Sequence, residues 1–321
     1  MIKIGIIGMG NVAWNVHLPV LLSRNDIKVC WVCDKDLNKE YVLNKKEIPS
    51  FDKLEKAINF EKCDIALLTA PYSEREKIFE QIKNLFKGIY FEKPFALTTK
   101  QHQYYSDNFK DYEITIGYQR RHMGTVKTIR NIINQNLFGH LISIKINFGD
   151  VYYKFDGFRS EKKKSGGGIF FESGSHWIDT VLFTTSAKDI KNFNLKKKEE
   201  NNLDIQSEGS FTIIDKKNHE FNCDFYMTIL ENTSNTIEYN FQNCSINLTL
   251  FDDDSQLRII NSDNNYIIKD DEFSIFPSKS LDVASSFWNY YLDCYKNRKN
   301  SDISASNFIL TTKIIELFYA K

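Results

Sequence analysis

Residues 8–13 read Gly8-Met9-Gly10-Asn11-Val12-Ala13, and they follow an apolar run at residues 3–7. A dinucleotide-binding turn needs glycine where a strand turns into a helix, glycine where the backbone touches pyrophosphate, and a small residue where the helix packs on the strand. Gly8, Gly10 and Ala13 meet these three needs in order. The helix that begins near Asn11 and Val12 would direct its N–H groups and the positive end of its dipole at the phosphates. We therefore expect a dinucleotide to bind at this turn.

Asp34 closes the next apolar run, roughly 20 residues after the glycine turn, where a carboxylate can accept hydrogen bonds from the adenosine ribose. The same carboxylate would repel the 2′-phosphate of NADP, so Asp34 favours NAD as the cofactor. Lys35 weakens that preference, because its charge would attract the phosphate. Asp34 is also a suitable N-cap for a helix after it, and the two roles are compatible.

The first third of the chain alternates short apolar runs with amphipathic stretches. Strands are expected at residues 3–7, 29–33, 65–69, 89–91 and 113–117, with helices at 12–23, 52–58 and 73–86. This alternation predicts β-α-β units on a parallel sheet. We assign residues 1–118 to an N-terminal α/β domain of the Rossmann dinucleotide-binding type.

After residue 117 the pattern changes to one helix, at residues 125–136, and a series of strands. The long run 141–155 alternates apolar and polar residues, which is typical of a half-buried strand. Further strands are expected at 210–214, 220–229, 236–241, 245–251 and 257–260, and helices at 281–296 and 303–319. We assign residues 119–321 to a substrate-binding and oligomerisation domain of the α+β class, with a large, mostly antiparallel open sheet.

The overall charge excludes some classes of partner. The chain has 321 residues, with 42 Lys plus Arg balanced by 42 Asp plus Glu. No global field therefore attracts nucleic acid or an anionic membrane. The first residues run directly into a strand, which leaves no room for a signal peptide, and no stretch reaches ~18 consecutive apolar residues. The sequence predicts a cytoplasmic protein without nucleic-acid or membrane partners.

The six cysteines, at positions 30, 33, 63, 223, 244 and 294, are expected to be reduced thiols of the core. Cys30 and Cys33 lie three apart in an apolar strand, so their side chains should point to opposite faces. No second pair supplies the remaining ligands of a tetrahedral zinc, and Glu172 with His176 has no further ligand set either. We expect no metal site.

Two further segments carry groups that could do chemistry. Glu92-Lys93-Pro94 follows an expected strand, at the edge of the sheet where ligands of an α/β fold bind. Glu172, His176 and Asp179 are spaced four and three apart, which places them on one face of a helix. Carboxylates on both sides of a histidine can fix its tautomer and bring its pKa toward neutrality.

The residues that precede Glu172 in the sequence offer further groups for ligand binding. The three glycines at 166–168 would let a bulky ligand approach the backbone. Arg159 and the lysines at 162–164 could meet an acidic or phosphorylated sugar, or could form a flexible charged loop. The runs 196–198 and 252–254 are expected to be solvated loops.

The glycine turn, Glu92-Lys93-Pro94, the segment 117–121 and the triple-glycine helix together resemble the glucose-fructose oxidoreductase/inositol dehydrogenase (Gfo/Idh/MocA) family. The resemblance covers nearly the whole chain. It implies an NAD-dependent oxidoreductase that transfers a hydride between nicotinamide and a secondary hydroxyl of a sugar, polyol or nucleotide sugar. In that reaction His176 is the general base and Lys93 polarises the oxygen.

The resemblance also implies roles for other residues. Glu172 orients the substrate or His176, and it stands where many relatives have aspartate. Arg75 stands where many relatives have histidine, which would alter how the cofactor or substrate edge is covered. His17 matches a family position but is expected to be structural. The cofactor contacts are implied to include Thr69, Pro71, Glu92 and Lys93, and the substrate contacts Lys93, Arg159, Glu172, His176 and Asp179.

Two other functions stay open beside the dehydrogenase. Some relatives are glycosidases that oxidise and re-reduce the sugar with a tightly held NAD, and others are non-catalytic regulators. The resemblance further implies a homodimer or homotetramer built through the C-terminal sheet. The alternating residues Ile142, Ile144, Ile146 and Phe148 support association, because a monomer would leave an apolar sheet face in water.

Overall fold

The computed structural model describes residues 1–36, 42–43, 46–109, 112, 114–250, 256–261, 265–269, 280–299 and 301–320. The chain forms two compact units, and each unit contains two separate segments. The first comprises Met1–Gly117 and Phe287–Phe308, and the second comprises Tyr118–Ser286 and Ile309–Lys321. A single division after residue 118 therefore does not describe the packing, since a C-terminal segment belongs to the first unit. The functional assignment of each part stays a prediction.

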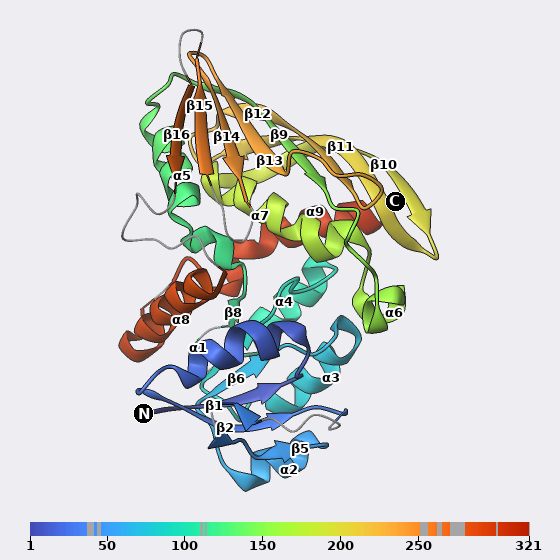
Figure 1. Cartoon of the computed structure of the whole chain (residues 1–321), viewed down its shortest axis with the longest axis vertical. Helices are drawn as coiled ribbons and strands as arrows, with labels where there is room; N and C mark the ends of the chain where they lie inside the picture. Colours follow the sequence, from blue (N-terminus) through green and yellow to red (C-terminus); the bar gives the residue numbers. More distant parts are fainter. Residues whose placement is uncertain are drawn as a thin grey trace. The chain divides into compact units, whose positions relative to one another are not determined.

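The first unit contains a six-stranded sheet in the order β5-β2-β1-β6-β7-β8, and every neighbouring pair is parallel (Figure 1). This is the strand order of a Rossmann fold, so the predicted fold class is confirmed. The central strands are apolar and buried because helices cover both faces of such a sheet. The strand bounds are β1 Ile2–Ile7, β2 Ile27–Cys33, β5 Ser50–Phe51, β6 Ile65–Leu68, β7 Gly88–Phe91 and β8 Ile114–Ile116.

The helices of the first unit differ from the expected ones in two places. Residues Ala13–His17 form a π-helical turn before the short α1 (Leu18–Leu22), where one α-helix was expected. The helix α4 (Thr99–Asn108) was not anticipated, because its many polar residues hide the apolar spacing. The other helices are α2 Leu54–Phe60, α3 Tyr72–Ile82 and the part of α8 (Ser280–Asn297) from residue 287 on. A short pair, β3 Val42–Leu43 and β4 Lys46–Glu47, lies outside the main sheet.

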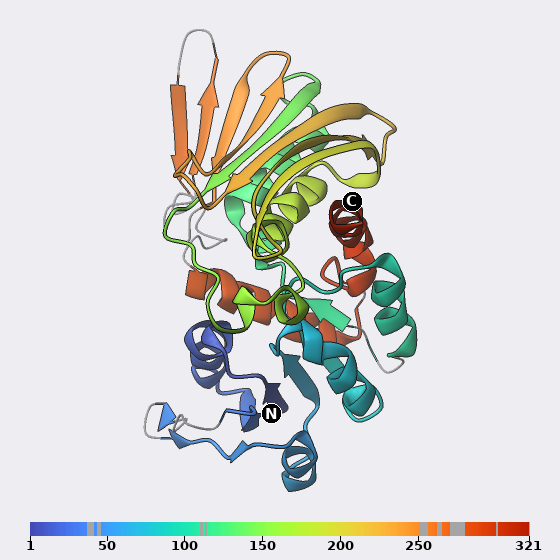
Figure 2. The same cartoon turned by 90° about the vertical axis from the view of Figure 1, so that its right-hand side faces the viewer.

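The second unit contains an eight-stranded sheet in the order β10-β11-β12-β9-β13-β14-β15-β16. β9 and β12 pair in parallel and the other neighbours are antiparallel, which confirms the predicted mostly antiparallel sheet. Figure 2 shows α7 against one face of this sheet. The bounds are β9 Leu141–Gly149, β10 Ala187–Glu200, β11 Leu203–Asp215, β12 Glu220–Thr228, β13 Thr236–Phe241, β14 Ser245–Thr249, β15 Gln256–Ile260, β16 Asn265–Lys269, α5 Gly124–Gln135, α6 Lys162–Ser165, α7 Ser175–Thr184 and α9 Ile309–Tyr319.

Two expected loops are regular structure. Residues 196–198 lie in β10, an edge strand of 14 residues whose outer half is largely exposed. Charged side chains on an edge strand oppose pairing with another chain, which explains why lysines occur there. Residues 162–164 form the short helix α6. The run 252–254, like Phe251 and Glu113 at the ends of two expected strands, lies outside the described residues.

The expectation of an apolar open sheet face is wrong. Ile144 and Ile146 are fully buried, and Phe148 packs with its ring 5.4 Å from that of Trp177 in α7. Only Ile142 of the four, with 57% of its surface exposed, faces water. Ile144, Ile146 and Phe148 therefore belong to the core of the second unit.

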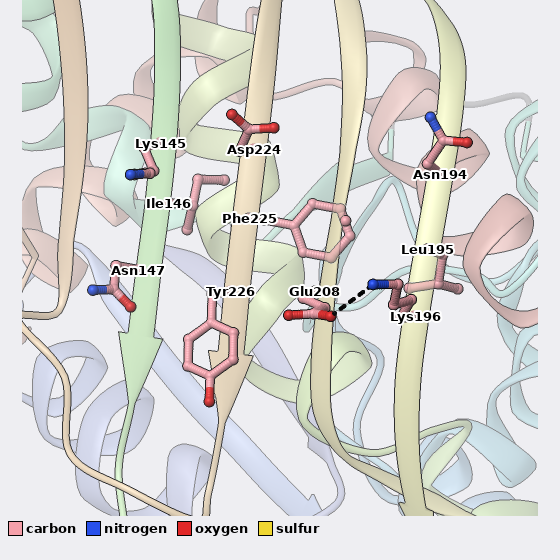
Figure 3. Close-up of a pocket in the computed structure, with 11 residues that line it drawn as sticks. Lys145, Ile146, Asn147, Asn194, Leu195, Lys196, Glu208, Asp224, Phe225 and Tyr226 are labelled. Carbon is pink, nitrogen blue, oxygen red and sulfur yellow. Dashed lines mark ion pairs between the residues drawn. The ribbon is translucent and has the colours of Figure 1, made fainter.

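The opposite face of the sheet carries charged side chains of both signs among apolar ones. Lys145 lies opposite Asp224 across the β9–β12 pair, and Lys196 of β10 is 3.6 Å from Glu208 of β11. These side chains line a hollow of about 700 Å³, and Figure 3 shows how they lie on the strands. Any partner at this face would therefore meet charged and hydrogen-bonding groups.

The cysteines of this protein are thiols without a metal-binding arrangement in the described part of the chain. All six cysteines are free thiols, and all but Cys63 are buried. Within that part of the chain, no cluster of histidine, cysteine and carboxylate side chains is arranged to hold a metal ion. None of the helices described there is long and apolar enough to cross a membrane.

A buried histidine makes the stability of the first unit depend on pH. His102 of α4 is 1% exposed, and its Nε2 lies 2.8 Å from the carbonyl oxygen of Ala305. Burial lowers the pKa of His102 to about 4. The unfolded chain, with an ordinary histidine pKa, takes up a proton first as pH falls. The contribution of neutral His102 to the stability of the folded state is therefore fully present at pH 7. It is lost as pH falls from about 6.5 toward 4.

We predict that His102→Gln, which keeps an N–H donor for Ala305, makes the free energy of unfolding depend less on pH below about 6.5. Between pH 7 and pH 5 the free energy of unfolding should fall by about 2 kcal/mol less in the variant than in the native protein. Urea unfolding at the two pH values measures the difference. Equal losses in both proteins would contradict a neutral buried His102.

Candidate active site

The glycine turn uses its glycines for different purposes. Gly8 has φ +95°, and a Cβ there would lie 2.6 Å from the backbone nitrogen of Ala70. The fold itself therefore requires glycine at position 8. At Gly10 a Cβ would meet nothing within 4 Å, so the protein leaves space beside this exposed backbone. That space fits the role expected of Gly10, which is close approach of a pyrophosphate.

The helix after the turn begins at Asn11 and Val12, and Ala13 is buried against the sheet. First-turn N–H groups have no acceptor within a helix, so they suit the phosphates of a dinucleotide. Thr69, at the end of β6, donates its hydroxyl to the carbonyl of Gly8 at 2.5 Å. Pro71 is the N-cap position of α3. These residues thus line or brace the carboxyl edge of the sheet.

Asp34 binds the glycine turn directly. The N–H of Met9 donates to Asp34 Oδ2 at 2.5 Å, and the N–H of Asp36 donates to Oδ1 at 2.9 Å. The carboxylate therefore fixes the end of β2 to the turn and still has acceptor capacity for a ribose. Lys35 Nζ lies 2.7 Å from Glu74 Oε2 of α3, so an anionic partner compensates its charge.

The Glu92-Lys93-Pro94 segment rests on a buried hydrogen-bond chain. Glu92 is 4% exposed, and its Oε1 lies 2.8 Å from Nε2 of the fully buried His17. Trp288 donates its indole N–H to His17 Nδ1 at 3.0 Å. Since an indole can only donate, Nδ1 carries no proton and Nε2–H must donate to Glu92. His17 therefore has a structural place, as expected, and its tautomer is fixed.

Two more contacts hold the same segment. The N–H of Lys93 donates to Glu92 Oε2 at 3.1 Å. Arg75, only 5% exposed, donates Nε–H to the carbonyl of Ala70 at 3.0 Å and Nη1–H to the carbonyl of Pro94. Arg75 thus lies within the fold. The Lys93 side chain is partly exposed beyond β7.

In the second unit, the three residues expected on one helical face have different environments. The segment Phe170–Gly174 is π-helical and α7 follows it, so the spacing is not that of a single α-helix. Glu172 Oε2 lies 3.7 Å from Arg159 Nε, and both side chains are partly exposed. His176 is partly exposed, with its ring edge-on to Tyr118 at 5.6 Å. Asp179, by contrast, is 2% exposed.

Asp179 is occupied by contacts within the second unit. Arg121 donates to its two carboxylate oxygens at 2.6 and 2.9 Å, and the hydroxyl of Thr311 donates at 3.0 Å. A buried ion pair satisfied in this way holds α7 to its neighbours. Of the predicted substrate contacts in the second unit, Glu172, His176 and Arg159 remain accessible.

The glycines before α7 make room for a buried carboxylate. A Cβ on Gly168 would collide with the backbone of Asp204, and one on Gly167 with Tyr319. Asp204 accepts hydrogen bonds from the N–H groups of Gly168 and Phe170, both at 2.8 Å, and from the Tyr319 hydroxyl at 2.7 Å. Burial raises the pKa of the Asp204 carboxyl. Packing therefore accounts for Gly167 and Gly168 without a ligand.

Sequence reasoning missed Tyr153 as well as Asp204 and Tyr319. Burial, together with the nearby Glu172 carboxylate, raises the pKa of the Tyr153 phenol, and its side chain hydrogen bonds to Ser173. Tyr153 therefore belongs to the same group of side chains as Glu172 and Arg159. Its only signal in the sequence is an aromatic pair, Tyr152-Tyr153, after an apolar run.

Comparisons with known proteins match both parts of this chain to one oxidoreductase family. Residues 2–117 match the family described as "Oxidoreductase family, NAD-binding Rossmann fold", and residues 126–210 match the "GFO/IDH/MocA C-terminal domain". The chain is 24% identical over 221 residues to glucose-6-phosphate 3-dehydrogenase of Bacillus subtilis. That alignment covers 62% of this chain and 60% of the relative, so the chain spans less than two thirds of its length.

Two crystal structures show the same fold. One is a 3-ketoreductase from Actinomadura kijaniata in complex with NADP and TDP-benzene, with a TM-score of 0.84, 12% identity, and coverage of 99% of this chain and 97% of that one. The other is an oxidoreductase from Agrobacterium radiobacter in complex with NAD⁺, L-tartaric acid and magnesium, with a TM-score of 0.81, 12% identity, and coverage of 99% and 95%. The fold thus occurs with either nicotinamide dinucleotide.

The two glycines of the turn give a matched pair of variants. Gly8→Ala should destabilise the protein by about 1–3 kcal/mol, because the left-handed backbone and the close Ala70 backbone both oppose a Cβ. Gly10→Ala should change stability by less than about 0.5 kcal/mol but weaken NADH binding about tenfold or more, because its Cβ would enter the space for pyrophosphate. Thermal unfolding and fluorescence titration with NADH measure the two effects. Native NADH affinity in the Gly10→Ala variant would contradict this placement of the cofactor.

Proposed function

Since the chain belongs to the Gfo/Idh/MocA oxidoreductase family, we propose that it is an NAD-dependent dehydrogenase. It transfers a hydride between nicotinamide and a carbon that bears a secondary hydroxyl, in a sugar, polyol or nucleotide sugar. One observation supports this most strongly. The glycine turn and Lys93 follow β1 and β7, which lie in one parallel sheet, so both come at its carboxyl edge. A cofactor and a cation for the reacting oxygen are therefore brought to the same edge.

The reaction needs a hydride acceptor and a base. Bound NAD would supply the hydride acceptor, so a side chain has to supply the base. His176 takes the hydroxyl proton, because an imidazole is the side chain that titrates near neutral pH. Lys93 stabilises the developing negative charge on the same oxygen. Glu172 orients the substrate or His176.

The remaining candidate residues take supporting roles. Arg159, ion-paired with Glu172, is the partly exposed cation that would meet an acidic or phosphorylated sugar. Asp179 holds α7 through Arg121 and contributes to substrate binding only by placing His176. Gly8, Gly10, Asn11, Val12, Ala13, Asp34, Thr69, Pro71, Glu92 and Lys93 form or brace the cofactor site.

The preference for NAD rests on charge. Asp34 presents a carboxylate at the end of β2, and Glu74 compensates the neighbouring Lys35. Among the residues that the structure describes here, a 2′-phosphate would therefore meet the Asp34 carboxylate beside a lysine, Lys35, that is already ion-paired. The ion pair with Glu74 reduces the attraction of Lys35 for the 2′-phosphate of NADP.

Asp34→Ser should narrow the difference in affinity between NAD and NADP by ~1–3 kcal/mol, the worth of a charge-assisted hydrogen bond. Glu74→Gln, which releases Lys35 but leaves Asp34 in place, should strengthen NADP binding alone. Titrations with both cofactors, checked for native thermal stability, measure these changes. Tighter binding of NADP than of NAD by the native protein would refute the assignment.

The names of two similar proteins indicate which carbon of the sugar to test first for oxidation. The Bacillus relative is a glucose-6-phosphate 3-dehydrogenase, and the Actinomadura protein is a 3-ketoreductase. We propose the hydroxyl on carbon 3 of a hexose as the first candidate. NADH formation across free, phosphorylated, glycosidic and nucleotide-linked sugars and polyols tests this class directly.

The rival functions give different outcomes in the same assay. A glycosidase with transient oxidation would release sugar without net NADH and would retain NAD through purification, which mass spectrometry detects. A non-catalytic regulator would bind cofactor and sugar without turnover. Lys93 and His176 are both present, which favours an enzyme over a regulator.

We also propose a homodimer or homotetramer through the sheet of the second unit. The support is now electrostatic rather than apolar, because the open face carries Lys145, Asp224, Lys196 and Glu208. Opposite charges on one face are complementary to a second copy of that face. Light scattering at low and high salt measures the assembly, which salt should weaken.

His176→Ala should lower turnover by roughly 10²–10⁴, the usual worth of a positioned general base. NAD affinity should change little, because Asp34 and the glycine turn belong to the first unit and His176 to the second. Steady-state kinetics and NAD titration on the same preparation separate the two effects. Undiminished turnover would show that His176 is structural and that another group takes the proton.

A further inference from the structure

Arg75 bridges two turns at the carboxyl edge of the first sheet. Its guanidinium donates one N–H to the carbonyl of Ala70, at 3.0 Å, and another to the carbonyl of Pro94. Ala70 follows β6, and Pro94 immediately follows Lys93. A guanidinium is planar and its donors have fixed directions, so one side chain fixes these two carbonyls relative to each other.

Glu92 holds the other side of Lys93. Its Oε2 accepts the Lys93 N–H at 3.1 Å, while its Oε1 is held by His17 at 2.8 Å. Trp288 fixes His17 in turn, so the carboxylate cannot rotate without breaking a buried hydrogen bond. A Cβ on Gly117 would lie 2.7 Å from Glu92 Oε1, so close packing confines the carboxylate too.

Burying the polar side chains of Arg75, Glu92 and His17 costs solvation free energy, so their presence in the core needs a reason. Arg75 is 5% exposed, Glu92 4% and His17 fully buried. Charged groups removed from water lose several kcal/mol of solvation, and apolar residues would pack the same space at lower cost. Polar groups form hydrogen bonds of defined direction, which apolar side chains cannot do. Here these bonds end on the amide of Lys93 and on the carbonyl of Pro94.

We propose that Arg75 and the His17–Glu92 pair are positioning residues for Lys93, which hold the main chain at the Lys93 amide and at the carbonyl of the next residue, Pro94. This inference rests on the proposed role of Lys93 at the reacting oxygen. The side chain of Lys93 is partly exposed and carries its ammonium on a four-carbon stem, so a fixed backbone limits the positions that the ammonium can reach. Small displacements of a reacting group cost large factors in rate.

A double-mutant cycle tests the coupling. Arg75→Gln should lower kcat about tenfold on the best substrate of the sugar panel, and Lys93→Ala should lower it further. If Arg75 acts through Lys93, Arg75→Gln should have almost no additional effect in the Lys93→Ala background. Independent, multiplicative losses would overturn the inference. His17→Phe, which removes the donor to Glu92, should show the same non-additivity.

A second readout needs no substrate. Acetylation by limiting acetic anhydride, followed by peptide mass spectrometry, reports how accessible and reactive each lysine amine is. Arg75→Gln should raise the labelling rate of Lys93 about threefold, because its segment gains freedom. Lys77, exposed on the same helix as Arg75, should label as in the native protein. Unchanged labelling of Lys93 would overturn the inference whatever the kinetics show.

Controls separate positioning from general damage. Arg24→Gln removes an arginine of the same unit that pairs with Asp26 and should leave both readouts unchanged. If Arg75→Gln does not fold, Arg75→Lys keeps the buried charge but loses the fixed two-carbonyl geometry, and should show the same direction of change. If Lys93→Ala keeps full turnover while labelling of Lys93 rises in Arg75→Gln, the proposed role of Lys93 fails and the anchoring stands.

Discussion

The buried hydrogen bond between His17 and Glu92 is the interaction on which the cofactor-binding unit depends. It joins the helix after the glycine turn to the loop after β7, and Trp288 extends it to a helix from the far end of the chain. A buried carboxylate without these donors would be costly to keep ionised. The glycine turn and the Lys93 segment are therefore held by one set of contacts rather than by two separate ones.

The second unit uses the same physical device. Asp204 is a buried carboxylate that accepts two main-chain N–H groups from the segment leading to Glu172 and His176, and Tyr319 completes its hydrogen bonds. In each unit, a carboxylate in the core fixes the backbone beside residues proposed to act on substrate. Preorganisation of this kind lets partly exposed side chains act from defined positions.

Sequence patterns predicted the features of this protein that depend on residues close together in the chain. Gly8, Gly10 and Asp34 lie in a short segment whose geometry follows from strand, turn and helix, and the period of two around Ile144 predicted a strand correctly. The direction of that strand's apolar face, toward helices of its own unit, could not be read from the sequence. Asp204 and Tyr319 were missed because their contacts join residues far apart in the chain. The π-helical turns were missed because they share the apolar spacing of α-helices.

We propose that a hydride passes directly from a sugar carbon to NAD. The most direct measurement is the fate of deuterium placed on carbon 3 of the best hexose substrate, with oxidised cofactor added and the products analysed by mass spectrometry. We expect deuterium to appear on the nicotinamide ring of released NADH and the sugar product to be a ketone. Deuterium that stays on the sugar, with the glycosidic bond cleaved and no NADH released, would contradict it.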